Sequence, residues 1–231
     1  AKSPKRRGAA EDLVRVAAAN QDAVETSGGI EVLILLLDPE VVDAVRSEAA
    51  TAISKVTENN SSTQRRVASG GGIHSLVLLL KESTATEPAK RAAAAALTSL
   101  TSSGNRDNQA SIADAEGITP IVETLRRGDL KTQEQVTSLL AVLGKDAPAN
   151  IESIATKLVD LLKSSEKLAA AKSAKAIAKI ANHASVEYQQ AIADHGGVAC
   201  LAVLLSEPEQ LPTTLTEDPR RLHKEVASAA G

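Results

Sequence analysis

The stretch ASGGGIHSLVLLLK, residues 68–81, has the composition of a loop that holds a phosphate group. Three glycines precede an apolar run, and backbone N–H groups at a glycine-rich helix start can bind anions. The Walker pattern, however, requires Lys followed by Ser or Thr directly after its last glycine, and here Ile73 and His74 follow Gly72. A dinucleotide fingerprint requires a preceding strand, and no segment of the chain shows sustained strand-like alternation. The glycines therefore favour a turn over a phosphate site.

The other residue types that commonly carry chemistry are scattered along the chain. Cys200 lies in the apolar run VACLAVLL and is predicted to be an inert core thiol. No G-x-S-x-G nucleophile elbow occurs. The four histidines lack the spacing of metal ligands and are expected at the surface or in a groove; they are His74, His183, His195 and His223. The sequence thus predicts no catalytic residue, no metal and no cofactor, and a protein that is not an enzyme.

The composition excludes several further classes of protein. Of the 231 residues, 43% are hydrophobic and 24% are charged, which is typical of a globular chain with a sizeable core. The net charge of −3 is too near neutral to indicate a nucleic-acid or membrane-surface partner. No apolar stretch approaches the roughly 20 residues that span a bilayer. A single cysteine excludes an internal disulfide, so we expect an intracellular protein, cytoplasmic or nuclear.

Two absences from the composition are unusual. The chain has no Met, which indicates that its natural start is missing and that it is a fragment or a processed or edited chain. It also has no Phe and no Trp, and Tyr188 is its only aromatic residue. We have no physical reason for the missing aromatic residues, but they limit the kinds of partner that the chain can bind.

The glycine turn recurs along the chain. A leucine-rich or apolar run follows Gly28-Gly29, Gly71-Gly72, Gly117 and Gly196-Gly197. Counted on the second glycine, the intervals are 43, 45 and 80 residues, and the last is twice 40. A repeat that has lost its glycine is therefore expected between 117 and 197, where ATKLVDLL (155–162) aligns with the other runs. Repetition at near-constant spacing indicates an architectural role, in which glycine supplies the positive φ that a chain reversal needs.

The pattern around each turn predicts three helices. A short lead-in precedes the glycine, at 20–27, 62–69, 108–116 and 188–195. Leucines at spacings of three and four predict a second helix after it. A third, alanine-rich helix follows at 41–56, 89–100, 132–143 and 169–181. We therefore predict an all-α chain with a period of about 42 residues.

This pattern resembles the armadillo repeat, in which a lead-in ends in a glycine turn and is followed by an L-V-x-L-L helix and an A-A-x-A-L-x-N-L helix. The resemblance covers about residues 11 to 231 and implies a right-handed superhelical α-solenoid of three-helix repeats. The expected divisions are a basic, disordered tail at 1–10, the end of a preceding repeat's third helix at 11–19, repeats at 20–61, 62–107 and 108–149, a degenerate repeat at 150–187, and a truncated repeat at 188–231.

The resemblance also implies that extended peptides bind in the concave groove lined by the third helices. In importin-α-like members, a Trp and an Asn four residues apart form a ladder that holds a basic peptide. The matching pairs here are Thr51 and Lys55, Ala95 and Ser99, Ser138 and Val142, and Lys175 and Lys179. None of them contains Trp or Asn, so a nuclear-import receptor is not expected.

Basic side chains occupy some of the ladder positions. Lys172, Lys175 and Lys179 follow one stripe of one helix, and Lys55 has an equivalent place in an earlier repeat. If these residues line one channel, the channel would favour an acidic extended partner, as the groove of β-catenin does. Equally, the lysines could merely solvate an alanine-rich helix, and Glu48 and Glu134 dilute the basic field. The predicted partner-binding set is Thr51, Lys55, Arg91, Ser99, Ser138, Lys172, Lys175 and Lys179.

The resulting prediction is a non-enzymatic scaffold that binds an extended, acidic protein segment. Interface hot spots are enriched in Trp, Tyr and Arg, and this chain offers mainly Arg, so we expect modest affinity with strong salt dependence. Two alternatives stay open. One is a structural element of a larger assembly that uses its convex face or its array ends. The other is a nucleic-acid-binding solenoid, which the negative net charge and the lack of aromatic stacking platforms disfavour.

Overall fold

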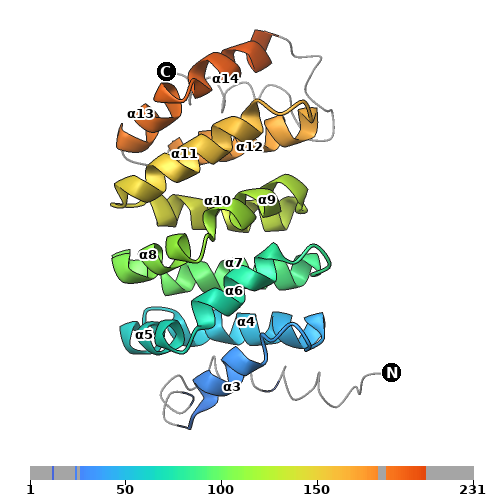
Figure 1. Cartoon of the computed structure of the whole chain (residues 1–231), viewed down its shortest axis with the longest axis vertical. Coiled ribbons are helices and arrows are strands. Elements are labelled where there is room, and N and C mark those ends of the chain that lie inside the picture. The colour runs from blue at the N-terminus through green and yellow to red at the C-terminus, as the bar shows by residue number, and fades with distance from the viewer. Residues whose placement is uncertain (1–11, 13–23, 25–26, 182–185, 207–231) are drawn as a thin grey trace. The chain divides into compact units, whose positions relative to one another are not determined.

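The computed structural model describes residues 12, 24, 27–181 and 186–206, and these consist of helices joined by turns (Figure 1). No strand occurs in this part of the chain. The predicted tail at 1–10, the helix end at 11–19, most of the first lead-in, His183, His223 and the last repeat beyond 206 lie outside the described residues. The chain divides into two compact blocks, Ala1–Ile121 and Val122–Gly231, and each is described by itself.

The helices follow the predicted three-part repeat. The first block contains α3 (Gly29–Leu35), α4 (Asp43–Thr57), α5 (Ser61–Ser69), α6 (Gly72–Lys81), α7 (Glu87–Leu100), a short 3-10 turn (Ser102–Gly104), α8 (Arg106–Asp114) and the start of α9 (Ile118–Arg127). The second block completes α9 and contains α10 (Leu130–Gly144), α11 (Pro148–Leu162), α12 (Lys167–Ala181), α13 (Val186–Asp194) and α14 (Gly197–Ser206). Third helices α4, α7, α10 and α12 begin and end within two residues of their predicted limits.

Small side chains bring the third helices of the first block close together. Helices α4 and α7 lie side by side, and α6 packs on α7 (Figure 1). Ala50 and Ala52 of α4, and Ala93, Ala94 and Ala96 of α7, are completely buried. In the second block α11 takes the central place, packed against α10, α12, α13 and α14. Both cores are therefore built mainly from alanine and branched aliphatic residues, and Tyr188 in the second block is the single aromatic residue among them.

The two glycines of each turn have separate roles, which corrects the sequence-based explanation. Positive φ belongs to the residue before the shared glycine, with values of 75° at Gly28, 83° at Gly71 and 82° at Gly196. Glu116 adopts it in the third repeat, with a φ of 56°. The shared glycine has no positive φ and is required by close packing instead. A Cβ on Gly72 would lie 2.5 Å from Cγ1 and 2.9 Å from the carbonyl oxygen of Val67.

The same approach recurs at every copy of the shared glycine. The oxygen that a Cβ would meet belongs to the residue five positions earlier, at 3.0 Å for Gly29, 2.7 Å for Gly117 and 2.7 Å for Gly197. Each of the later copies also touches the second helix of the preceding repeat. These contacts join Gly72 to Ile34, Gly117 to Val77, and Gly197 to Val159. The missing side chain therefore lets two helices of one repeat and one helix of its neighbour meet at a single point.

The fourth repeat has lost this turn altogether. Helix α11 runs unbroken over 15 residues, where the other repeats have a short helix, a turn and a second helix. Ile154, which aligns with the shared glycine, is a completely buried residue inside it. Pro148 stands in the first turn of α11, where its missing N–H costs nothing. The degenerate repeat predicted at 150–187 is thus a pair of helices, α11 and α12.

Side chains at the start of a repeat bind the last carbonyl groups of the third helix before it. A helix end leaves up to four carbonyl groups without a partner inside the helix, and buried ones need another donor. Here the hydroxyl of Thr63 donates to the oxygen of Val56 at 2.6 Å, the amide of Asn108 to that of Leu100 at 2.7 Å, and the amide of Asn150 to that of Leu143 at 3.0 Å. Asn150 keeps this bond in the repeat that has lost its glycine.

Gln64 joins two successive third helices through the same kind of bond. Its Nε2 donates to the oxygens of Thr57 at 3.1 Å and of Ser99 at 3.0 Å, at the ends of α4 and α7. Its Oε1 accepts a bond of 3.2 Å from Nδ2 of Asn105. In the last repeat Gln189 stands in the equivalent place, and its Nε2 donates to the oxygen of Ala181 at 3.1 Å.

A buried ion pair holds the loop between α6 and α7 on α4. Arg46 is 2% exposed, and its two terminal nitrogens bind the carboxylate of Glu82 at 2.6 and 2.7 Å. The hydrogen bond to Glu82 raises the pKa of Arg46. Asp43 binds Arg46 at 3.2 Å and accepts the backbone N–H of Thr86 at 2.7 Å. The start of α7 is thus positioned by two side chains of the preceding repeat.

Cys200 is placed differently from its prediction, since it is half-buried in α14 and not part of a closed core.

Lys81 joins the end of α6 to the next repeat. It is exposed, donates to the carbonyl oxygen of Ala115 at 3.3 Å, and its Nζ lies 3.6 Å from the carboxylate of Glu116. It therefore contacts the turn of the next repeat.

Tyr188, the only aromatic residue, takes the position that Thr63 and Asn108 hold in other repeats. It is 2% exposed, and burial raises its pKa. The hydroxyl group has no hydrogen-bond partner. Its ring fills the space beside Gly144, where a Cβ would lie 2.4 Å from Cε2 of the ring. At this repeat junction, packing of the ring takes the place of the bonds that Thr63 and Asn108 donate, while Gln189 still binds the carbonyl oxygen of Ala181.

The two glycines of a turn are expected to respond differently to alanine. Gly72→Ala places a methyl group against the carbonyl of Val67, and we expect it to lower the free energy of unfolding by about 3 kcal/mol. Gly71→Ala meets no atom within 4 Å and should cost only the left-handed backbone strain, about 1 kcal/mol. Urea denaturation followed by far-UV circular dichroism measures both values. Equal losses would contradict the division of roles between the two glycines.

Tyr188 offers a second test of the packing. Tyr188→Phe removes a buried hydroxyl without a partner, so the free energy of unfolding should stay the same or rise by up to about 1 kcal/mol. Tyr188→Ala removes the ring and should lower it by about 3 to 5 kcal/mol. Thermal unfolding of both variants gives the comparison. A clear loss in the Phe variant would mean that the hydroxyl group has a partner in solution.

Candidate functional site

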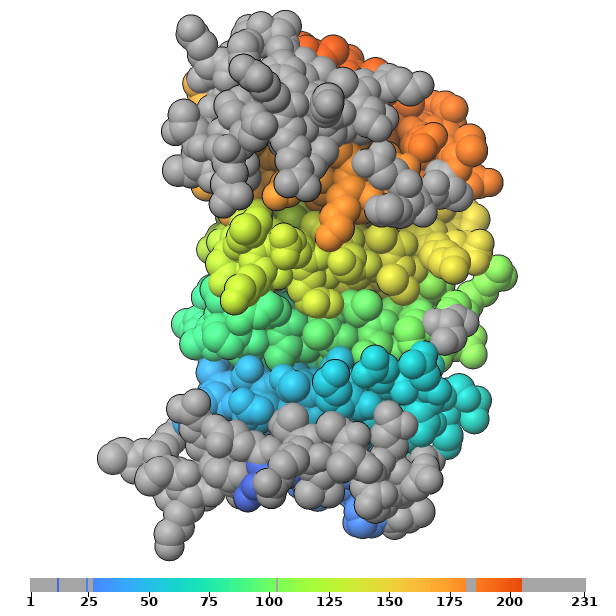
Figure 2. Space-filling view, turned by 180° about the vertical axis from the view of Figure 1, so that it is seen from behind, coloured from blue at the N-terminus to red at the C-terminus, as the bar shows by residue number. Residues whose placement is uncertain are grey.

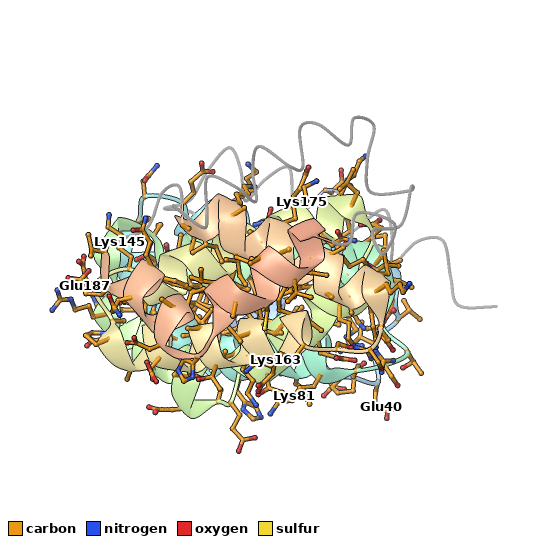
Figure 3. The ribbon with its side chains drawn as sticks, turned by 90° about the horizontal axis from the view of Figure 1, so that it is seen from above. Glu40, Lys81, Lys145, Lys163, Lys175 and Glu187 are labelled. Carbon is orange, nitrogen blue, oxygen red and sulfur yellow. The ribbon has the colours of Figure 1, made fainter. Side chains whose placement is uncertain are left out.

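The predicted binding residues lie on the third helices. Figure 2 shows this side of the chain, viewed from behind relative to Figure 1, with the surfaces of α4 and α7 in blue to green. In the second block, Lys175 and Lys163 lie on opposite sides. Figure 3 shows Lys175 of α12 on one side and Lys163, which follows α11, on the other. The residues on the two sides can therefore be examined, and changed, independently.

In the first block the predicted hydroxyl groups are already bonded within the protein. Thr51 is half-buried, and its hydroxyl donates to the carbonyl oxygen of Ser47 at 2.8 Å. The hydroxyls of Ser99 and Ser54 share a bond of 3.0 Å, which joins α7 to α4. Lys55 is exposed, and its Nζ lies 3.6 Å from the carboxylate of Glu58. Arg91 is half-buried in the first turns of α7.

In the second block the predicted charges are less engaged. Lys175 is half-buried and Lys179 is exposed, and neither forms an ion pair or hydrogen bond with a described residue. Ser138, on the facing helix α10, is half-buried and donates its hydroxyl proton to the carbonyl oxygen of Glu134 at 3.0 Å. The structure thus brings Ser138, Lys175 and Lys179 onto two neighbouring helices.

Lys172 differs from the other predicted binding residues because its charged group is already bonded within the protein. It is 7% exposed, and its ammonium group donates to the carbonyl oxygens of Arg126 at 2.7 Å and Gly128 at 3.2 Å, at the end of α9. A buried ammonium group is stable where carbonyl oxygens replace its water shell, and a helix C-terminus supplies these with a favourable dipole. Lys172 shares the helical stripe of Lys175 and lines the same hollow, but its ammonium group is held at the end of α9.

A shallow hollow lies between α10 and α12 and is open to solvent. Its lining combines aliphatic carbon with a few charged groups and consists of Leu125, Leu130, Gln133, Glu134, Thr137, Lys172, Lys175, Ala176 and Lys179. Because the hollow is shallow and open, it can receive part of a ligand, such as one side chain, but it does not surround a drug-sized molecule.

Sequence reasoning missed the aliphatic part of this lining. Leu130 is 55% exposed at the start of α10, directly after Asp129, which caps the helix by accepting the N–H of Thr132 at 2.7 Å. A signal was present, because Leu130 lies outside the buried stripe of α10 that includes Val136, Leu139 and Leu143. An aliphatic residue off the buried stripe of an amphipathic helix has no core to fill.

The other charges near the end of α9 neutralise one another. Arg126 binds Glu123 at 2.6 Å and Glu166 at 2.7 Å, and Arg127 also contacts Glu123. The hydrogen bonds from Arg126, followed by those from Arg127, lower the pKa of Glu123 to about 2. Among the charged residues that line the hollow, Lys175, Lys179 and Glu134 have no such partner in the described part of the chain.

The opposite side of the second block is tied together by His195. Its Nε2 lies 2.7 Å from the carboxylate of Glu152 and 3.1 Å from the hydroxyl of Thr156, both on α11. The carbonyl oxygen of His195 accepts a bond of 3.2 Å from Lys163. These contacts fix the turn between α13 and α14 on α11. The other described histidine, His74 in the first block, is exposed. Nowhere in the described residues do three His, Cys, Asp or Glu side chains gather as a metal site would require.

None of the described helices is both long and apolar enough to cross a membrane. No protein-family model matches the sequence. No curated protein resembles it at a significant level.

Solved structures, in contrast, match nearly the whole chain. An engineered protein shares 28% sequence identity at a TM-score of 0.66, over 96% of this chain and 90% of that one. A designed armadillo repeat protein in complex with the peptide (KR)4 has a TM-score of 0.66 over 100% of this chain and 96% of its own, at 19% identity. Computationally designed armadillo repeat proteins for modular peptide recognition also have a TM-score of 0.66 at 19% identity, over 96% and 90% of the two chains. With its glycine turns, its three-helix repeats and these likenesses, the chain has an armadillo-like α-solenoid fold.

Proposed function

We propose that this protein is a non-enzymatic scaffold that binds an extended, acidic segment of a protein partner on the face formed by its third helices. The observation that carries the proposal is the pair Lys175 and Lys179. These two cationic side chains border an open hollow and have no partner among the described residues. The other proposed contacts are polar positions on third helices of each block. They are Thr51, Lys55, Arg91 and Ser99 on α4 and α7 in the first block, and Ser138 on α10 in the second.

The similar structures support peptide binding as the general activity. Two of them are described as armadillo repeat proteins, one in complex with a peptide and one designed for peptide recognition. The peptide (KR)4 in the first complex is basic. Lysines at the ladder positions of this chain would repel such a peptide, since like charges at an interface oppose binding. The charge of Lys175 and Lys179 supports a partner of opposite sign.

The spacing of the two lysines also suits a chain of carboxylates. Residues four apart lie on one face of a helix, about 6 Å apart along its axis. Side chains on one face of an extended segment repeat about every 6.6 Å. Lys175 and Lys179 can therefore pair with two acidic residues separated by one other residue. Because both ammonium groups are accessible to solvent, the attraction should fall steeply as salt is added.

The protein offers little to a nucleic acid. Single strands bind to exposed aromatic rings on which bases stack, and the only aromatic residue, Tyr188, is 2% exposed. The net charge of −3 opposes a long polyanion, although it still permits a short acidic segment to bind at a local cationic site.

Charge reversal on α12 tests the proposal. In Lys175→Glu with Lys179→Glu, a labelled peptide rich in aspartate should bind at least about tenfold more weakly than to the unchanged protein at low salt, because attraction becomes repulsion. The matched control is Lys157→Glu with Lys163→Glu, which changes the net charge equally on α11 and at its end. Fluorescence anisotropy measures the dissociation constants.

Each alternative outcome of this experiment has a clear meaning. If the control pair weakens binding as much as the α12 pair, the peptide senses net charge and not this face. If a single-stranded oligonucleotide of equal charge binds more tightly than the peptide, the protein is a nucleic-acid-binding solenoid. If no acidic peptide binds the unchanged protein, the proposal is wrong.

A second candidate function is assembly through the first and last described helices. Leu35 of α3 is 71% exposed and Val198 of α14 is 39% exposed. Ile73, which aligns with Val198, is 4% exposed. Exposed aliphatic side chains on helices that are otherwise used for repeat packing favour contacts with another protein or another repeat.

Assembly predicts that the mass of the protein in solution depends on these side chains. If the exposed helices mediate self-association, Leu35→Asp and Val198→Asp should reduce the fraction of oligomer at a fixed concentration, because a buried carboxylate at an interface is strongly unfavourable. Light scattering coupled to gel filtration measures the fraction. A monomer before and after both changes would remove self-association through these helices from consideration.

A further inference from the structure

The hollow between α10 and α12 combines two kinds of surface that a purely electrostatic site does not need. Its base is aliphatic, with Leu125 and Ala176 at 1% and 2% exposure and Leu130 at 55%. Its rim carries Lys175 and Lys179 on the α12 side and Glu134 on the α10 side. A site that only attracts carboxylates needs the exposed lysines but does not need the exposed aliphatic surface of Leu130.

The exposed side chain of Leu130 determines which kind of group the hollow favours. Most large aliphatic side chains of α10 are completely buried, but Leu130 leaves more than half of its surface in water at the edge of the hollow. A partner that covers this surface gains the hydrophobic contribution that the fold itself leaves unused. The hollow is shallow, with an aliphatic base and a charged rim, which favours a single aliphatic side chain over a larger ligand.

The charges then define what surrounds that side chain. Lys175 and Lys179 stand on one wall without partners in the described residues, whereas the ammonium group of Lys172 is held by hydrogen bonds to the carbonyl oxygens at the end of α9. Acidic residues beside the aliphatic one would meet the α12 wall. Glu134 faces them across the hollow and disfavours a carboxylate on the α10 side, so the two walls distinguish one side of the segment from the other.

We propose that the hollow between α10 and α12 is a specificity pocket for one leucine-like side chain within an acidic segment, with Leu125, Leu130 and Ala176 as its base and Lys175 and Lys179 as its acidic-residue contacts. This inference rests on the proposed function, since it names the sequence class that the same face selects. It adds a prediction that charge alone does not make: acidic peptides of equal charge bind differently.

Two peptides of equal length and charge test this prediction on the full chain. One has an aspartate directly before and directly after a single leucine, so that its two carboxylates have the spacing of Lys175 and Lys179, and the other has alanine in place of the leucine. The leucine peptide should bind about tenfold more tightly, because the apolar surface of its side chain is removed from water. Isothermal titration calorimetry or fluorescence anisotropy at low salt gives both dissociation constants.

Substitutions in the protein distinguish binding of the leucine in this hollow from non-specific hydrophobic binding. In Leu130→Ser the preference for leucine over alanine should fall to less than about twofold, while the alanine peptide binds as before. The matched control is Leu168→Ser on α12, because Leu168 is 44% exposed but does not line the hollow. This control should retain the tenfold preference. Circular dichroism of both variants verifies that the helices are intact.

The outcomes distinguish this inference from the proposed function. If both peptides bind equally and charge reversal at Lys175 and Lys179 weakens both, the face binds acidic segments but the pocket does not select leucine, and the inference is overturned. If Leu168→Ser removes the preference as Leu130→Ser does, the selecting surface is not this hollow. If neither peptide binds, the proposed function fails and the pocket fails with it.

Discussion

The repeated need to satisfy the carbonyl groups at buried helix ends shapes most of this protein. The described helices are seven to 15 residues long, so the chain has a large number of ends for its length. The bonds that Thr63, Asn108 and Asn150 make to the preceding third helix solve this problem at three junctions. Since the donor is in one repeat and the acceptor in the one before, each bond that completes a helix also joins neighbours. The same hydrogen bond therefore ends one helix and holds two repeats together. Because Asn150 makes this bond, the fourth repeat still packs on the third although its glycine turn has disappeared.

The position of a lysine on a third helix determines whether its charge is bonded within the fold or left for a partner. Lys172 and Lys175 are one helical turn apart and would be assigned to the same face by periodicity. The first reaches the exposed carbonyl oxygens at the end of α9 and becomes part of the core. The second has no helix end within reach and stays at the rim of the hollow. The carbonyl oxygens at a helix end in the adjacent repeat thus compete with a binding partner for the cationic side chains of a third helix. Lysines that cannot reach these oxygens are left to contact a partner.

The sequence predicted the helices well because their signals are local and repeated. Alanine-rich and leucine-rich segments at a fixed period placed the third helices within two residues, since each copy supports the interpretation of the others. It could not assign the reason for the shared glycine, because the carbonyl of Val67 that approaches Gly72 is placed by the crossing of two helices and not by a motif. It could not show the hydrogen bonds of Lys172 for the same reason, because their acceptors lie at the end of another helix. It overlooked Leu130, although the departure of that residue from the buried stripe of α10 was visible in the residues alone.

The single tyrosine gives this protein an uncommon optical property. With no Trp and no Phe, absorption and fluorescence in the near ultraviolet come from Tyr188 alone, on α13 beside Gly144. Far-ultraviolet circular dichroism, in contrast, averages over every helix. Repeat arrays can lose their terminal repeats before their centre, so the two signals need not change together. Without any label, the difference between the two melting curves would report how early the packing around α13 loosens relative to the rest of the chain.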